Sequence, residues 1–254
     1  MTRWLVAVLS AVGILIAVGR LQVSATSDIF TDATAQAGIT WRHANGESGE
    51  KFLIEAMGGG VAFLDFDGDG LPDLFFVTGG ETPKSPHNSP PHNALYRNLG
   101  NGKFVDVAEK AGLARIPFYG MGVAVADFDN DGRMDLFVAN ANAEPYLYHN
   151  TQSTGHHWAQ FVLEGTKSNR TGVGAQVRLT SGGRTYLSFV NGGNGFGAQS
   201  TSRVHFGMGA SNTIDRLEIR WPSGLKQVLE KLSADRIYKI QEGKAKTEVL
   251  VAKR

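Results

Sequence analysis

The sequence predicts an all-β protein, on three observations. First, 32 glycines in 254 residues separate many short apolar runs. Second, those runs are rich in Val and Phe and lack the long 3.6-residue periodicity of helices. Third, the same acidic nine-residue stretch occurs twice, each time between two such runs. With 42% hydrophobic residues, the chain can bury a core in one large or two modest domains.

The overall charge and the cysteine count exclude some classes of protein. The formal net charge is +1, so no global field recruits nucleic acid or a membrane surface, and we expect no nucleic-acid partner. The chain contains no cysteine and therefore no disulfide framework. Acidic charge is instead local, in the repeated stretch.

Residues 1–25 read as an export signal. Arg3 gives a positive start, residues 4–18 are an apolar run, and residues 23–25 (Val-Ser-Ala) fit a small-residue cleavage site. An uncleaved N-terminal membrane anchor is the alternative, because Arg20 interrupts the approach to that site. Either way, we expect an extracytoplasmic protein, secreted or periplasmic, either free or held by that anchor.

The repeated stretch places four carboxylates at its positions 1, 3, 5 and 9, with a glycine at position 6 for a sharp turn. Like charges about 4 Å apart cost about 4 kcal/mol per pair at an effective dielectric near 20, and a hard divalent cation reverses that sign. Oxygen-only ligation with a tight glycine turn favours Ca²⁺. We therefore predict two Ca²⁺ sites, each also using the backbone carbonyl of position 7. The predicted ligands are Asp65, Asp67, Asp69, Leu71 and Asp73 in the first loop, and Asp127, Asp129, Asp131, Arg133 and Asp135 in the second.

Two other interpretations of the stretch fit it less well. A solvated Asp/Gly turn explains one copy, but two copies in identical register argue against it. An EF-hand needs a bidentate Glu at position 12, where the sequence has Phe76 and Val138. Because the flanking runs read as buried strands, each loop is predicted to join the two strands of a hairpin.

The rest of residues 26–154 repeats as well. Residues 93–104 predict a hairpin, and residues 146–150 echo its first half. Residues 30–39 and 104–113 both combine an aromatic strand end, a short helical turn and a glycine. A period of roughly 60 residues with about four strands per unit is typical of propeller blades. The proline-rich residues 81–92 contain His87 and His92, which could ligate a metal, although a solvated loop is the favoured interpretation.

Residues 155–243 predict a β-sandwich or barrel-like domain of about seven short strands, followed by a polar tail at 244–254. His156 and His157, at the junction, are expected to pack or cap rather than to bind a metal. Ser168-Asn169-Arg170 either presents a polar triad to a ligand or stabilises a turn. No catalytic residues can be assigned, and the glycine-rich residues 191–197 lack the following helix of a phosphate loop.

Two resemblances follow from these motifs. The acidic loops, their glycine-apolar lead-ins and the Leu95-Tyr96-Arg97-Asn98 hairpin resemble FG-GAP (VCBS-type) repeats, found in integrin-like β-propellers that hold Ca²⁺ in such loops. Residues 168–170 with Gly174-Ala175, residues 205–209 and residues 221–224 resemble the ASPIC/UnbV domain. The resemblance implies an extracellular calcium-binding module and no established reaction. Propellers need four to eight blades to close, so the open edges of two blades must be covered by the C-terminal domain, by a second copy of the chain or by another partner.

The function favoured by the sequence is therefore that of an exported, calcium-binding protein that binds or scaffolds an unknown protein or glycan, and a non-enzyme is favoured over an enzyme. One alternative is an accessory or catalytic protein in natural-product or glycan tailoring. The other is a subunit that completes a β-propeller in trans, as a homo-oligomer or with another chain.

Overall fold

The computed structural model describes residues 30–80, 92–114, 119–193 and 198–250. The chain divides into residues 1–33, of which only 30–33 are described, and a larger unit of residues 34–254. The expected export signal and His87 lie outside the described residues. Within the described ranges, no helix is long and apolar enough to span a bilayer. Helical structure is limited there to α2 (Thr34–Ala37) and the 3₁₀ turn η1 (Leu53–Ala56).

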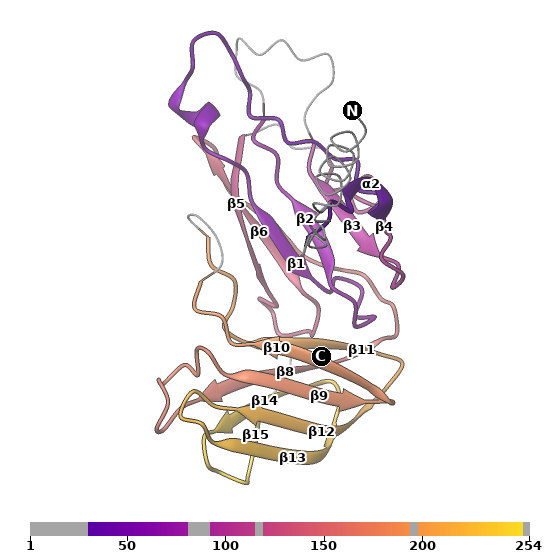
Figure 1. Ribbon diagram of the computed structural model, residues 1–254, viewed down its shortest axis with the longest axis vertical. Coiled ribbons are helices and arrows are strands. Elements are labelled where there is room, and N and C mark those ends of the chain that lie inside the picture. Colours follow the sequence, from indigo (N-terminus) through magenta and orange to yellow (C-terminus); the bar gives the residue numbers. More distant parts are fainter. Residues whose placement is uncertain (1–29, 81–91, 115–118, 194–197, 251–254) are drawn as a thin grey trace, which may run out of the picture. The chain divides into compact units, whose positions relative to one another are not determined.

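The first repeat is a four-stranded antiparallel meander (Figure 1). Its strands are β1 (Val61–Leu64), β2 (Asp73–Phe76), β3 (Ala94–Asn98) and β4 (Phe104–Asp106), paired in that order. The first acidic loop joins β1 to β2, whose paired ends are Leu64 and Asp73. The predicted hairpin over residues 93–104 is confirmed as β3 and β4.

The second repeat has the same order but three strands among the described residues: β5 (Tyr119–Ala126), β6 (Asp135–Ala141) and β7 (Tyr146–Tyr148). Its acidic loop joins β5 to β6, with Ala126 opposite Asp135. The expected count of about four strands fails here for a local reason. After β7 the polar groups of Asn150 and Thr154 bond to the carbonyl oxygens of the first acidic loop, so this segment does not return as a strand.

One hydrophobic core serves both repeats. It contains buried residues of both sheets, including Leu64, Phe75, Val123 and Val138. A Cβ at Gly60 would lie 2.9 Å from the backbone nitrogen of Val123, so the glycine permits close approach of the two repeats. The blades therefore pack as a pair rather than as separate hairpins.

The C-terminal region is a sandwich of two four-stranded sheets, neither closed into a barrel. One sheet has the order β10-β9-β12-β13, and the other β11-β8-β14-β15. The strands are β8 (His157–Glu164), β9 (Gln176–Ser181), β10 (Arg184–Phe189), β11 (Val204–Gly209), β12 (Thr213–Arg220), β13 (Lys226–Ser233), β14 (Arg236–Gln241) and β15 (Glu248–Leu250). Their inward side chains, among them Phe161, Leu217 and Trp221, form the second large core.

Seven of these strands match the seven expected from alternation, and β15 does not. The segment at 244–254 was expected to be a polar tail, yet residues 248–250 pair antiparallel with β14. Only three residues pair there, and a run this short is not long enough for alternation in the sequence to predict a strand.

Candidate metal centres

Each acidic loop gathers the carboxylates of its positions 1, 3 and 9. One carboxylate oxygen from each of Asp65, Asp67 and Asp73 lies within 4.8 Å of the others. Asp127, Asp129 and Asp135 form the equivalent group in the second loop. Positions 1 and 9 meet because the two strands flanking each loop are paired at its base.

The glycine at position 6 holds the first carboxylate in both loops. The backbone N–H of Gly70 donates to Asp65 Oδ2, and that of Gly132 donates to Asp127 Oδ2, each at 2.9 Å. The two glycines have φ of +85° and +92°, a backbone conformation that a side chain would strain. The turn thus fixes where the position-1 oxygen points.

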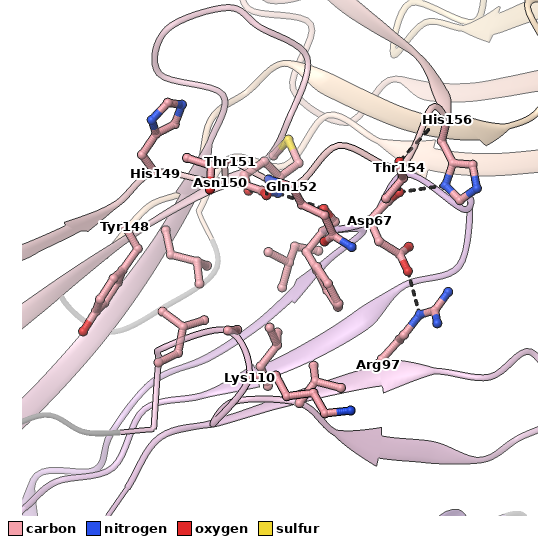
Figure 2. Close-up of a pocket in the computed structure, with 18 of the residues that line it drawn as sticks. Asp67, Arg97, Lys110, Tyr148, His149, Asn150, Thr151, Gln152, Thr154 and His156 are labelled. Carbon is pink, nitrogen blue, oxygen red and sulfur yellow. Dashed lines mark hydrogen bonds and ion pairs between the residues drawn. The ribbon is translucent and has the colours of Figure 1, made fainter.

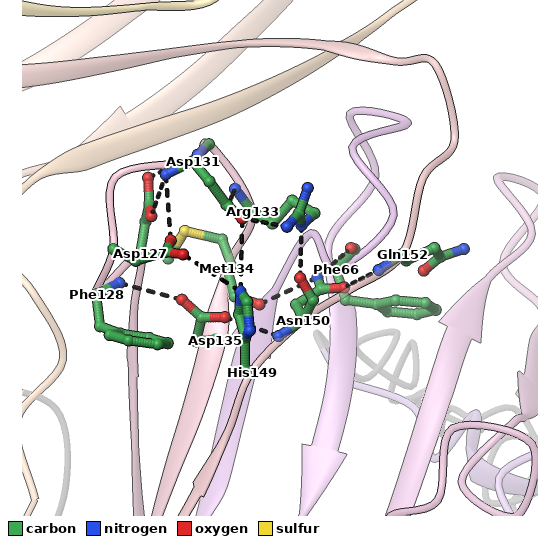
Figure 3. Close-up of polar contacts among 12 residues, drawn as sticks. Phe66, Asp127, Phe128, Asp131, Arg133, Met134, Asp135, His149, Asn150 and Gln152 are labelled. Atoms are coloured by element: carbon green, nitrogen blue, oxygen red, sulfur yellow. Dashed lines mark hydrogen bonds and ion pairs between the residues drawn. The ribbon is translucent and has the colours of Figure 1, made fainter. Parts of the chain in front are cut away.

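The carboxylate at position 9 accepts two backbone N–H groups, one from its own loop and one from an asparagine at the end of the next strand or just after it (Figure 3). Asp135 accepts the backbone N–H groups of Phe128 at 3.1 Å and Asn150 at 2.8 Å. Asp73 accepts the equivalent bonds, from the second residue of its loop at 3.1 Å and from Asn98 at 2.7 Å. The two repeats therefore build the same cradle with the same backbone donors.

The residues at positions 5 and 7 are hydrogen-bonded to each other in both loops. Asp69 Oδ1 accepts the N–H of Leu71, and Asp131 Oδ1 accepts the N–H of Arg133, both at 2.9 Å. Positions 5 and 7 thus brace the turn, and position 5 is outside the 1-3-9 groups. Asp131 instead groups with Asp129 and His149.

Burial and mutual repulsion make the first loop electrostatically unfavourable by itself. Burial, together with the neighbouring carboxylates Asp69 and Asp67, raises the pKa of Asp65 to about 7. Burial likewise raises the pKa of Asp73 to about 7. Among the described residues, the buried Asp65 Oδ1 has no hydrogen-bond partner. A set of fixed oxygens, one of them unsatisfied, fits a hard divalent cation.

A basic side chain stands beside each loop at the same point of the repeat. Arg97 Nε lies 2.6 Å from Asp67 Oδ2, and this negative charge raises the pKa of the guanidinium. His149 Nε2 lies 3.4 Å from Asp129 Oδ2. Sequence reasoning passed over both residues, although the parallel between Tyr96-Arg97-Asn98 and Tyr148-His149-Asn150 contained the signal.

The sandwich also contacts both loops. Gln160 Nε2, from β8, donates to Asp127 Oδ2 at 2.5 Å. His205 Nε2, from β11, donates to the carbonyl oxygen of Gly132 at 3.1 Å. A Cβ at Gly207 of β11 would lie only 1.8 Å from Asp65 Oδ2, so this glycine is required for the close contact. Sequence reasoning missed these residues.

The segment between β7 and β8 completes the packing around Asp67 (Figure 2). Thr154 Oγ1 donates to the carbonyl oxygen of Asp67 at 3.0 Å, and His156 Nδ1 lies 2.8 Å from the same oxygen. His157 Nδ1 lies 2.8 Å from Asp235 Oδ2. Both histidines of the pair therefore contact polar groups of the protein at the junction.

A pocket of about 660 Å³ opens beside the first loop, between the two repeats (Figure 2). Apolar side chains of both repeats, such as Leu64 and Leu136, line it together with Asp67, Arg97 and Lys110. One wall is therefore made of the same side chains that surround the acidic loops.

His92, one of the two histidines of the proline-rich stretch, is exposed, and its carbonyl oxygen accepts the Trp41 indole N–H at 2.7 Å.

A second polar cluster lies within the sandwich and is structural. Glu242 Oε2 accepts the three successive backbone N–H groups of residues 166–168 at 2.7–2.8 Å, and Oε1 accepts the hydroxyls of Ser168 and Ser223. Burial raises the pKa of this carboxyl, but the hydrogen bonds outweigh it and lower the pKa to about 2. Asn169 Oδ1 accepts the N–H of Val173 at 2.8 Å. Of the two interpretations of residues 168–170, the contacts of Ser168 and Asn169 match turn stabilisation.

The fold and these sites define a chain that combines an FG-GAP-like repeat with an ASPIC and UnbV domain. The FG-GAP-like repeat model matches residues 65–138, which span both acidic loops, and the ASPIC and UnbV model matches residues 165–247. Both resemblances noted in the sequence are thereby confirmed.

The chain is similar over most of its length to proteins named cartilage acidic protein 1. It is 27% identical over 183 residues to the Xenopus tropicalis protein and 24% identical over 249 residues to the human one, covering 69% and 77% of this chain. A 56-residue stretch, 22% of this chain and 9% of the relative, is 46% identical to the mouse protein. The matches span only 27% and 36% of the frog and human relatives' own length.

Proposed function

We propose that this chain is an extracytoplasmic interaction module, with a protein or glycan as its partner, whose two acidic loops each bind a Ca²⁺ ion. The observation that carries the proposal is the repeated cradle. In both loops the carboxylates of positions 1, 3 and 9 lie within 4.8 Å of one another and are held by equivalent backbone donors. The N-terminal sequence pattern and relatives named for cartilage support a location outside the cytoplasm.

Bound calcium would stabilise the folded state as well as support partner binding. Asp65, Asp67 and Asp73 must approach one another for the hairpin to close, and a bound cation removes that repulsion. Because the unfolded chain has no such cradle, binding stabilises the folded state by mass action. The loops also lie against β8 and β11, so the ions would stiffen the contact between repeats and sandwich.

The surface proposed for partner contact is the pocket beside the first loop. Its volume of about 660 Å³ is within the range of pockets that bind small ligands or a partner's side chain. Lys110, an exposed cation on its lining, offers a charge for an anionic group. Asp67 and Arg97 line the same pocket, so occupancy of the loop would alter one wall.

Calorimetric titration of the chelator-treated protein with Ca²⁺ tests the metal sites. We expect two equivalents for the natural sequence and one equivalent each for Asp67→Ala and Asp129→Ala. Glu230→Gln, on the exposed face of the sandwich, is the matched control and should keep two. EDTA should lower the melting temperature of the natural protein. An unchanged melting curve with chelator, together with no calcium heat, would refute the proposal.

A pull-down from the native envelope fraction, with and without Ca²⁺, tests the interaction surface. We expect a specific partner that is captured in Ca²⁺ and lost in EDTA or with Lys110→Glu. Capture that is indifferent to both changes would place the contact surface elsewhere.

A further inference from the structure

We propose that the second acidic loop also takes a transition-metal ion of the Zn²⁺ type, through Asp129, Asp131 and His149, and that the first loop does not. The inference rests on the proposed function in one respect: the acidic loop is taken to be a cation cradle. It goes beyond that function because it assigns the two repeats different metal selectivity.

The difference comes from one position of the repeat. Arg97 and His149 both follow a tyrosine and precede the asparagine that holds position 9. A guanidinium carries only donors and stays protonated, so Arg97, which contacts Asp67, cannot serve as a metal ligand. A neutral imidazole offers a lone pair, which suits zinc and related ions.

The spacing around His149 matches a small tetrahedral ion. Its Nε2 lies 3.4 Å from Asp129 Oδ2 and 3.5 Å from Asp131 Oδ2. Bonds of 2.0–2.1 Å at a tetrahedral angle separate two ligand atoms by about 3.4 Å. The observed distances exceed the roughly 2.7–2.9 Å of a charge-assisted hydrogen bond, so the imidazole is near these oxygens without bonding them tightly.

The imidazole is oriented from the side by Phe128. The two rings lie edge to face, with centroids 5.3 Å apart and planes at 76°. Phe128 is the second residue of the same loop, so the loop that supplies the carboxylates also orients the histidine (Figure 3).

A separate observation on the sandwich side points to a cation at the Asp127 group of this loop, which shares Asp129 with the proposed set. Gln160 is 1% exposed, and its Nε2 donates to Asp127 Oδ2 at 2.5 Å. Its other amide atom, Oε1, is buried and has no hydrogen-bond partner among the residues the structure describes. An unsatisfied amide oxygen on a side chain touching an acidic loop is the kind of group that a cation or its water completes. The first loop has Gly207 on this side, which brings no such amide.

Arg133 is a competitor within the second loop. Its guanidinium contacts Asp131 Oδ2, one of the oxygens in the proposed set. A bound ion must share or displace that contact, so Arg133→Gln should tighten Zn²⁺ binding.

The experiment titrates the full chain with Zn²⁺ by calorimetry and with Co²⁺ by visible absorption, and uses the two repeats as mutual controls. We expect His149→Arg, which copies the first repeat, to weaken Zn²⁺ about tenfold or more and to abolish the Co²⁺ absorption. His149→Gln should do the same without adding charge. Arg97→His, which copies the second repeat, should add a second Zn²⁺ equivalent. Because His149 is 41% exposed, its variants should fold, and circular dichroism checks this.

The failure of this inference is distinguishable from failure of the proposed function. Unchanged Zn²⁺ affinity and Co²⁺ absorption in both His149 variants would overturn it, whatever the calcium result. Loss of Zn²⁺ binding in those variants would support it even if calcium titration found no sites, and the calcium proposal alone would then fall.

Discussion

Gln160 in the sandwich donates a 2.5 Å hydrogen bond to Asp127 in the second acidic loop, 33 residues earlier in the chain. The amide is buried, so the bond forms away from water, where an unpaired carboxylate would be costly. This contact joins the ASPIC/UnbV sandwich to a candidate metal ligand of the FG-GAP-like repeat. Folding of the sandwich and occupancy of the loop should therefore be thermodynamically coupled.

Replacement of Gln160 tests this coupling. Gln160→Met keeps the side-chain length and removes the donor, which leaves Asp127 with only its backbone partners. We expect the free energy of unfolding to fall by about 1–3 kcal/mol. Chemical denaturation in Ca²⁺ and in EDTA measures it, with Glu230→Gln on the exposed face as the control. A variant as stable as the control would show that the contact contributes nothing.

Gly207→Ala tests the close approach of β11 to the first loop. The added Cβ would lie 1.8 Å from Asp65 Oδ2, so the carboxylate or the strand must move. We expect a loss of about 1–3 kcal/mol in unfolding free energy and a weaker Ca²⁺ site at the first loop, with the second loop retained. Gly58→Ala is the matched control, since a Cβ there meets nothing within 4 Å. Equal stability of the two variants would contradict the geometry.

The Glu242 cluster predicts a specific pH dependence. The folded-state pKa of about 2 lies below the ordinary value of 4.5, so the ionised carboxylate stabilises the fold. That contribution is complete above pH 4.5 and is lost as pH falls toward 2. Glu242→Gln should therefore lower the unfolding free energy by about 2 kcal/mol at pH 6, from lost charge-assisted hydrogen bonds. The gap between the two proteins should shrink between pH 4.5 and 2 in denaturant titrations; a constant gap would be inconsistent with the depressed pKa.

The sequence was sufficient where the signal is local. The 1-3-5-9 spacing, with glycine at position 6 and short apolar flanks, predicts each loop and its hairpin, and Asp65, Asp67 and Asp73 do converge. Strand alternation gives the seven strands from His157 to Gln241. In both cases the residues that decide the structure are within a few positions of one another.

The sequence was insufficient where distant segments meet. Gln160 and Gly207 read as ordinary strand residues, because their role depends on which loop faces the strand. Glu242 gathers backbone groups from more than seventy positions away, as the separation from residues 166–168 shows. The spacing also assigns Asp69 and Asp131 to the ion; one oxygen of each carboxylate accepts the N–H of position 7, and the assignment stays a prediction. Spacing identifies the oxygens but not the competition among their partners.

The two asparagines after the basic position offer a prediction in which one repeat controls for the other. Asn150 Nδ2 donates to the carbonyl oxygen of Phe66 in the other repeat's loop at 2.8 Å and to that of Met134 in its own repeat at 3.2 Å. Asn98 Nδ2 donates to the equivalent carbonyl oxygen in its own repeat, that of Pro72, at 2.9 Å. Both main-chain N–H groups, which hold position 9, remain after substitution by alanine.

Asn150→Ala should therefore cost more than Asn98→Ala. The first removes a part-buried hydrogen bond between the two loops and leaves the Phe66 carbonyl oxygen without that donor. We expect the free energy of unfolding to fall by about 1–3 kcal/mol. The second removes an exposed bond, worth about 1 kcal/mol or less. Denaturant titration of both variants, with and without Ca²⁺, gives the comparison. Equal losses would mean that the link between the repeats carries no free energy of its own, and that the shared core alone holds the two blades together.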